Sequence, residues 1–320
     1  MKRAVVYTSV LLLFLASPAL VKAGEEKGLE TSTDLELQIS SLPELRFRLS
    51  QSFSFPFLQG QNPLTQDNNI KVVVTADVTP VSLAGIGEII WTPAAFFMLS
   101  GGGQAGSGWD IPLGKGIGIN TPVGVKTPGV VRHADIDGKA FDGLIWHIWG
   151  AGTFQFDLGA LIPGDWTHVV FQTRQEFRYS AYTRAGSDDS WVFENDDAEN
   201  LNGWKYFATY ILGYQMPQSP VLSMVGFMAE LQKTLYHIPG GDYWGDGLGY
   251  WIFSGMGLFT ITPRFTATLA VQMRTRDNYD TTDFANKNDY YYQDMELLDK
   301  GGKRRIVFYR FALMLNYKIR

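Results

Sequence analysis

VFYRFALMLNYKI, residues 307–319, is the stretch of sequence that decides the fold of this chain. Its odd-numbered positions are all apolar or aromatic, whereas its even-numbered positions include Arg310, Asn316 and Lys318. Successive side chains of a β-strand point to opposite faces, so this alternation predicts a strand with one apolar face and one polar face. The length of the run and the aromatic residues near its ends favour a strand that spans a membrane.

The same alternation recurs in four further segments, 45–57, 167–183, 204–216 and 264–276. Apolar or aromatic residues dominate one face of each, and each is long enough for the roughly 9–11 residues that a tilted membrane-spanning strand needs. Lipid offers no hydrogen-bond partner to an open sheet edge, so such a sheet has to close on itself. We therefore expect an all-β fold, a closed antiparallel up-and-down transmembrane β-barrel.

About twelve strands account for the whole pattern. The weak point is Pro80, where the apolar residues change from even to odd positions, because a proline there marks either a turn or a bulge. If it is a bulge, and if 33–41 is not a separate strand, the number of strands falls to ten. The expected strands lie near residues 33–41, 45–57, 69–79, 81–91, 94–103, 143–158, 166–183, 203–216, 221–236, 249–261, 264–276 and 304–320.

The connections between these strands alternate in length. Short turns are expected at 92–93, 159–165, 217–220 and 262–263, and long polar segments at 104–142, 184–202, 237–248 and 277–303. Outer-membrane barrels have short periplasmic turns and longer external loops. With the last strand ending in the periplasm, all four long segments are expected outside the cell.

The first residues have the features of an export signal. Lys2 and Arg3 precede an apolar, uncharged run, and small residues precede a cleavage site after Ala23. We expect a signal peptide over 1–23, a short leader over 24–32 and a single barrel domain over 33–320, located in the outer membrane. The alternative is an uncleaved membrane helix, because the run is close to the minimum spanning length.

Composition excludes several other classes of protein. Three of the 27 basic residues lie in the signal, so 24 basic residues face 32 acidic ones and the net charge of the remainder is about −8. Such a balance argues against a nucleic-acid partner. The chain has no cysteine, hence no disulfide and no thiol for a lipid anchor. The chain has no second long apolar run, so a bundle of membrane helices is not expected.

Function is expected on the inward face of the barrel. Rings of arginine or lysine select for anions in pores, so the inward cations favour passage of anionic solutes. The alternative is that arginine and glutamate pair across strands and fill a narrow interior. We expect no metal and no cofactor. The candidate lumen-lining residues are Arg174, Glu176, Arg178, Arg264, Arg274, Arg276, Arg310 and Lys318.

Aromatic side chains near strand ends are expected to anchor the barrel at the two membrane interfaces. Acidic residues cluster in the long segments 184–202 and 277–303, where they either gather divalent cations or keep the loops solvated. The glycine-rich tract 101–124 is expected to be a flexible loop that folds into the lumen as a constriction. The candidate anchors are Trp146, Trp166, Trp204, Tyr250, Tyr309 and Tyr317.

No sequence motif indicates catalysis. A Gly-x-Ser-x-Gly elbow is missing from the chain. A triad could still assemble across strands, with His133 beside Asp135 or His237 beside Asp242 as the best candidates. We expect that the protein is not an enzyme.

The signal, the absence of cysteine, the Thr-Pro turns and the final residues LNYKIR (315–320) resemble the bacterial outer-membrane β-barrel superfamily. The segment 81–109, with WTP at 91–93 and GSGW at 106–109, is faintly similar to uncharacterised spirochaete barrel proteins. The resemblance implies outer-membrane lipids and the barrel-insertion machinery as partners. The chain departs from the superfamily in ending at Arg320 rather than at an aromatic residue.

Three functions remain open. The first is a porin-like channel for passive passage of small solutes, with anionic solutes as the preferred class. The second is a non-conducting structural or adhesive barrel that presents acidic loops. The third is an outer-membrane hydrolase. We favour the channel, because many barrels of this kind are channels and not because any motif indicates it.

Overall fold

The computed structural model describes residues 28–320 except 43, 113, 124–132, 163, 188, 195–199, 218, 220, 237–248, 278, 281–295 and 298–303. The expected signal peptide, 1–23, lies outside the described residues. None of the described residues forms a helix that is long and apolar enough to cross a membrane.

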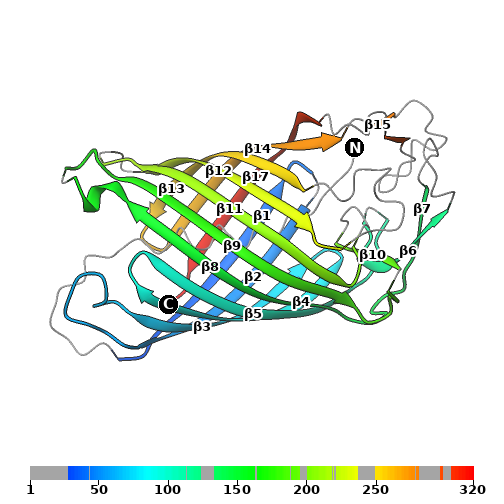
Figure 1. Ribbon diagram of the computed structural model, residues 1–320, viewed down its shortest axis with the longest axis horizontal. Coiled ribbons are helices and arrows are strands. Elements are labelled where there is room, and N and C mark those ends of the chain that lie inside the picture. Colours follow the sequence, from blue (N-terminus) through cyan, green and yellow to red (C-terminus); the bar gives the residue numbers. More distant parts are fainter. Residues whose placement is uncertain are drawn as a thin grey trace.

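Twelve antiparallel strands form a closed barrel in the order β1-β17-β14-β13-β12-β11-β9-β8-β5-β4-β3-β2 (Figure 1). The all-β, up-and-down prediction is confirmed, and the count is twelve rather than ten. β1 begins at Glu30 and so takes up the last residues of the expected leader. The barrel strands are β1 (Glu30–Ser40), β2 (Glu44–Pro56), β3 (Asn69–Thr79), β4 (Ser82–Ala94), β5 (Phe97–Gly108), β8 (Ile145–Asp157), β9 (Val169–Tyr182), β11 (Gly203–Gln215), β12 (Leu222–Thr234), β13 (Tyr250–Thr262), β14 (Phe265–Asp277) and β17 (Arg304–Lys318).

Pro80 lies in a tight turn between β3 and β4, not in a bulge. Thr79 pairs with Ser82 across this turn, and their hydroxyl oxygens are 2.7 Å apart. Because Pro80 has no N–H to donate to the ladder, the strand has to end there. The change of apolar positions at Pro80 is therefore the change of direction between two strands.

The two ends of the barrel differ, as the connection lengths predict. The four long segments all leave from one end, the long-loop end, where β7 and β15 also lie in Figure 1. The long-loop end also carries the tight turns between β1 and β2 and between β3 and β4, and the other end, the short-turn end, has two longer connections, 57–68 and 158–168. Asn62 holds the connection 57–68 together, because its side-chain oxygen accepts hydrogen bonds from the N–H groups of Leu64 and Thr65 at 3.0 and 3.1 Å.

The outer face of the barrel is apolar and the inner face is largely polar. On β9, for example, Phe171 and Phe177 are exposed outward, whereas Gln172, Arg174 and Glu176 between them are buried in the interior. Exposed apolar side chains recur on the outward positions of the other barrel strands. A lipid environment stabilises this arrangement, because the outward apolar side chains then contact hydrocarbon instead of water.

β17 departs from the expected alternation at Tyr309. The pairing with β14 shifts by one residue, so that Gln272 faces Arg310 while Met273 faces Phe308. Tyr309 is the extra residue of a β-bulge, and both Tyr309 and Arg310 are buried in the interior. The expectation that every odd position of 307–319 faces outward is therefore wrong for Tyr309 and for Val307, which pairs with the inward Arg274, and Phe308 takes an outward position.

A small second sheet lies at the long-loop end. It consists of β6 (Ile117–Val123), β7 (His133–Asp137) and β10 (Ser190–Phe193), in the order β10-β6-β7. We call these three strands, together with Glu194, the loop cap. The prediction of a flexible loop over 101–124 is wrong, since 101–108 belongs to β5 and 117–123 to the loop cap. Three further short elements are described: the 3-10 helix Leu158–Ala160 and the paired β15 (Tyr279–Asp280) and β16 (Glu296–Leu297).

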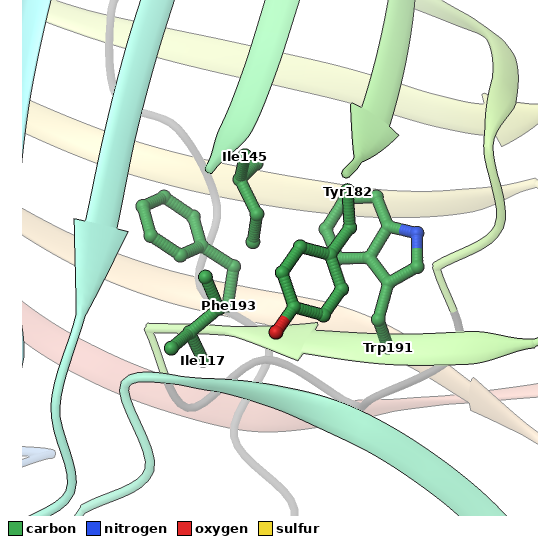
Figure 2. Close-up of a cluster of buried hydrophobic side chains, with 5 residues drawn as sticks. All are labelled: Ile117, Ile145, Tyr182, Trp191 and Phe193. Carbon is green, nitrogen blue, oxygen red and sulfur yellow. The ribbon is translucent and has the colours of Figure 1, made fainter. Parts of the chain in front are cut away.

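The loop cap has an apolar core that it shares with the barrel. Ile117, Trp191 and Phe193 of the cap pack against Ile145 and Tyr182, which lie at the ends of β8 and β9 (Figure 2). The aromatic rings of Tyr182 and Trp191 meet edge to face, with 6.2 Å between their centroids. Burial of these large side chains fixes the loop cap to the long-loop end of the barrel.

Candidate functional site

The interior of the barrel is the candidate functional site, and β9 supplies its most ordered group of charges. Arg174, Glu176 and Arg178 occupy successive inward positions of this strand, and all three are buried. Glu176 accepts a hydrogen bond from Arg174 Nη2 at 2.9 Å and one from Arg178 Nε at 2.8 Å. The carboxylate lies between two guanidiniums of its own strand, whereas the sequence predicted such pairs across strands.

Arg174 also extends across part of the lumen to two other strands. Its Nη1 donates to Ser100 of β5 at 3.1 Å, and its Nη2 lies 3.5 Å from a carboxylate oxygen of Glu88 on β4. Since β8 and β5 separate β9 from β4 in the ring, this side chain bridges the interior instead of lining it. The bridge reduces the free cross-section of the lumen.

Arg178 is held by aromatic rings as well as by Glu176. Its guanidinium carbon lies 4.7 Å from the ring centre of Phe207 and 5.5 Å from that of Trp149. Cation–π contacts of this kind gain strength where water is excluded. Arg178 is therefore fixed on three sides by β8, β9 and β11.

A second group of charges lies on β1, β2 and β3. Asp77 accepts a hydrogen bond from Arg48 Nε at 3.0 Å and lies 3.4 Å from Arg46 Nε. Arg48 also forms an ion pair of 3.5 Å with Glu36. Two guanidiniums and two carboxylates thus compensate one another within the barrel wall, where they are largely shielded from water.

The loop cap adds a third carboxylate to this second group. Glu194 forms an ion pair with Arg46 on β2 and accepts a hydrogen bond of 2.5 Å from the hydroxyl of Ser82 on β4. Its own N–H donates to the carbonyl of Gly116 at 3.0 Å. Glu194 follows β9 in the chain but contacts the far side of the ring, so it fastens the loop cap across the long-loop end.

The third polar group surrounds Arg310 on β17. Arg310 Nε donates to Gln272 at 2.5 Å, Gln272 Nε2 donates to Ser254 at 2.8 Å, and Arg310 also forms an ion pair with Glu44. The guanidiniums of Arg310 and Arg274 lie 4.8 and 4.7 Å from the ring centre of Tyr309. The bulge thus places one aromatic ring against two cations.

One part of the inner face is apolar. Ile211 of β11, Met228 of β12 and Met314 of β17 form a buried cluster, with Met256 of β13 packed against it. Methionine side chains are unbranched and adaptable, so they fill irregular space between strands. This cluster occupies interior volume between β11, β12, β13 and β17, and Ile211 pairs with Gln172 of β9.

The structure separates the predicted lumen residues into three sets. Arg174, Glu176, Arg178, Arg274 and Arg310 are buried in the interior. Arg264 lies in the turn between β13 and β14, and both it and Lys318 are exposed at the short-turn end. Arg276 is part of β14, but its side chain lies outside the described residues.

Four of the six predicted anchors lie on the outside of the barrel or at its short-turn end. Trp146 and Trp204 flank Tyr179 on the outer face near the long-loop end, with ring centres 5.4 and 5.5 Å from that of Tyr179. Trp166 and Tyr317 are exposed at the short-turn end. Both positions suit the aromatic girdles of a membrane barrel.

Tyr250 and Tyr309 do not lie where an anchor would. Tyr309 is buried at the bulge, and Tyr250 packs against Tyr309 and Ile252 on the inner face, where its hydroxyl donates to Gln232 at 2.5 Å. The expectation failed for Tyr309 because the bulge reverses its face. It failed for Tyr250 because an aromatic residue at the end of a strand can lie on the outer or the inner face of the barrel.

Two groups of interior residues were missed by the sequence argument. Arg46 and Arg48 had a signal, since they alternate with Leu45, Phe47 and Leu49 and so face inward. Glu194 had none, because an acidic residue in an acidic loop gives no indication of a partner on a distant strand.

Within the described residues, one histidine meets a serine in the interior. His147 Nδ1 lies 2.8 Å from the hydroxyl oxygen of Ser180, beneath the ring of Phe193. Both side chains are buried, so a substrate has no access to this pair in the capped barrel. The side chains of His133 and Asp135, and the whole of His237 and Asp242, lie outside the described residues.

A closed ring of twelve antiparallel strands, apolar outside and largely polar inside, defines the chain as a transmembrane β-barrel of the outer-membrane class. No protein-family model matches the sequence, and no curated protein matches it. Solved structures that resemble it include the following. The KdgM porin is 10% identical, with 90% of this chain and 99% of that one covered and a TM-score of 0.37.

Two further solved structures are similar to this chain. The translocator domain of the autotransporter NalP from Neisseria meningitidis is 7% identical, with 92% and 90% of the two chains covered and a TM-score of 0.35. OmpT, an outer membrane protein of Vibrio cholerae, is 8% identical, with 91% and 97% covered and a TM-score of 0.30. The comparisons give no support to a similarity with spirochaete barrel proteins.

Proposed function

We propose that this chain is an outer-membrane, porin-like channel for passive passage of small polar solutes and that it catalyses no reaction. The observation that carries the proposal is the polar inner wall within a ring whose outside is apolar. Eight-stranded barrels have interiors that side chains fill, and those of 16 or more strands leave an aqueous channel. Twelve strands give an intermediate interior, which Arg174 and the methionine cluster narrow.

We propose weak selectivity between ions rather than the strong anion preference that inward arginines alone would give. Arg46, Arg48, Arg174, Arg178 and Arg310 each lie against at least one carboxylate. Paired charges cancel one another in the field that an ion crossing the lumen experiences.

Planar-bilayer recording of the purified, folded protein tests this proposal. We expect discrete conductance steps and a reversal potential close to zero in a salt gradient. Correct folding is checked independently by the heat-dependent shift of the band on an SDS gel. A barrel that is folded by this criterion and conducts neither as the intact chain nor without residues 184–202 would overturn the proposal.

A non-conducting barrel is the second candidate, and the loop cap and methionine cluster favour it because both occupy the path through the ring. Recording a variant that lacks residues 184–202 separates the two functions. Conductance in this variant but not in the intact chain supports a capped channel. Silence in both, with folding preserved, supports the structural barrel.

Export and insertion complete the proposal. A signal peptide over residues 1–23 would direct the chain across the inner membrane, and the barrel-insertion machinery would then place it among outer-membrane lipids. N-terminal sequencing of protein extracted from the outer membrane is expected to start at Gly24. A start at Met1 would contradict cleavage.

A further inference from the structure

The contact between Glu194 and the barrel wall has the chemistry of a bound carboxylate ligand. Arg46 contributes a guanidinium and Ser82 a hydroxyl, and the two come from different strands, β2 and β4. Ser82 is 1% exposed and Arg46 is 7% exposed, so the site is built from fixed and largely dehydrated groups. Charge-assisted hydrogen bonds of this type are among the stronger ones in proteins.

The site is braced from behind. Asp77 lies against Nε of Arg46, whereas Glu194 is bound through Nη2, so the two carboxylates contact different parts of the guanidinium. The Ser82 hydroxyl also lies 2.7 Å from that of Thr79, whose oxygen accepts the N–H of Val81. These contacts hold both binding groups in place whether or not Glu194 is present.

The charges of the wall balance without Glu194. Arg46 and Arg48 already face Asp77 and Glu36, so departure of Glu194 leaves Arg46 with a carboxylate partner. Loss of the only buried partner of a guanidinium would strongly destabilise the folded protein. The contact with Glu194 can therefore be exchanged at much lower cost than the pairs within the wall.

Glu194 also has an unusual backbone. Its φ angle is +53°, in the left-handed region that residues other than glycine seldom adopt. Strain of this kind persists only where the surrounding contacts maintain it. The strained backbone aims the carboxylate at Arg46 and Ser82 and would relax if the carboxylate were displaced.

We propose that Arg46 and Ser82 form a recognition site for the carboxylate group of a solute, that Glu194 occupies this site when no solute is bound, and that exchange of the two releases the loop cap. The proposal rests on the proposed channel function and deepens it by naming the class of solute. The paired charges of the lumen give little selectivity between ions. A preference for carboxylate solutes can still arise, because recognition takes place at the mouth of the barrel and not along the whole lumen.

Competition with free acetate tests the site directly. The chain has no cysteine, so one introduced at Val192, which is 0% exposed within the loop cap, reports cap opening through its rate of reaction with a maleimide. Acetate should raise the labelling rate of this reporter, because it competes with Glu194 for Arg46 and Ser82. Glu194→Ala should raise the rate about tenfold or more without acetate, since a charged hydrogen bond is lost, and acetate should then add nothing further.

Acetamide is the matched ligand control, since it has the shape of acetate without the charge, and it should have no effect. Arg46→Ala in the same background should abolish the acetate effect. Asp189→Ala is the matched protein control. It removes an acid of the same connection that bonds only locally, to Gly186 N, and should leave labelling unchanged. Glu194→Gln serves as a second opening variant, with folding checked on SDS gels.

Two results would overturn the inference. Unchanged labelling in both Glu194 variants would show that the carboxylate does not hold the cap, and equal effects of acetate and acetamide would show that the site does not recognise charge. Labelling needs no ion flow, so it separates this inference from the channel proposal. Faster labelling with acetate in a barrel silent in bilayers would preserve the site and remove the channel.

Discussion

Glu176 shows how the interior charges act at the scale of single residues. Its carboxylate is shared by Arg174 and Arg178, both buried. The pairing does not by itself make the barrel more stable than apolar side chains would, because each charge has been removed from water. Removal of one partner destabilises the barrel, since it leaves the other charges buried and uncompensated.

Glu176→Gln is therefore expected to lower the free energy of unfolding by about 3 kcal/mol or more. Urea unfolding of the protein in lipid vesicles, followed by tryptophan fluorescence, measures this change. Glu30→Gln makes the same chemical change at the exposed start of β1 and should alter stability by less than about 0.5 kcal/mol. Equal effects of the two substitutions would refute a role of the buried pairing.

At the scale of single residues, the sequence predicted the strand face of a side chain better than the residues that this side chain contacts. Alternation placed Arg174, Glu176 and Arg178 on the inner wall, because it needs only the geometry of one strand. It could not show that Arg174 reaches Glu88, 86 positions away in the chain. Such contacts depend on the order and curvature of the ring, which no local pattern encodes.

The loop cap is the element that most depends on close backbone contact. Gly116 precedes β6 and lies against Trp109 and the turn that contains Val81. A Cβ atom at this position would be 2.4 Å from the carbonyl oxygen of Val81 and from backbone atoms of Trp109. Backbone cannot move aside as a flexible side chain can, so only glycine allows the loop cap to seat against the rim.

Gly116→Ala is expected to push the loop cap away from the rim without unfolding the barrel. Cleavage by trypsin after Lys115, mapped by mass spectrometry, should become about tenfold faster, in line with the cost of a steric clash. Gly87→Ala on the outer face of β4 is the matched control, because nothing lies within 4 Å of a Cβ there. Unchanged cleavage in Gly116→Ala would contradict the close contact.

The sequence predicted the barrel strands but not the loop cap, for a physical reason. Long strands repeat the two-residue period many times, whereas β10 has only four residues, all buried, and no alternation. The bulge at Tyr309 was missed because Val307 and Tyr309 are themselves apolar or aromatic, so the sequence alternation continues although the bulge reverses the faces of the residues before Arg310.

At the scale of the whole molecule, the apolar exterior commits the barrel to lipid. Val74 lies near the middle of β3, on the outer face, and is 54% exposed. Val74→Arg should destabilise the folded barrel in vesicles by about 2–4 kcal/mol, the cost of an arginine near the midplane. Folding yield measured across a urea series gives this value.

Leu161 is the comparison residue. It lies in the connection between β8 and β9, beyond the strands, and is 70% exposed. Leu161→Arg should cost less than about 1 kcal/mol, as expected near or outside the interface. Equal costs for the two substitutions would mean that depth in lipid does not govern stability, and the membrane assignment would have to be abandoned.

The seam between β1 and β17 has a consequence for biogenesis. Thr33 exchanges hydrogen bonds with Ile319 and Arg320, so the earliest and the latest strands to be synthesised complete each other. Until β17 arrives, β1 and β14 each carry a flank of unsatisfied backbone groups that invites aggregation. A circular permutant opened at the Pro80 turn would instead bring β1 and β17 together as a hairpin and leave β3 and β4 to be joined last.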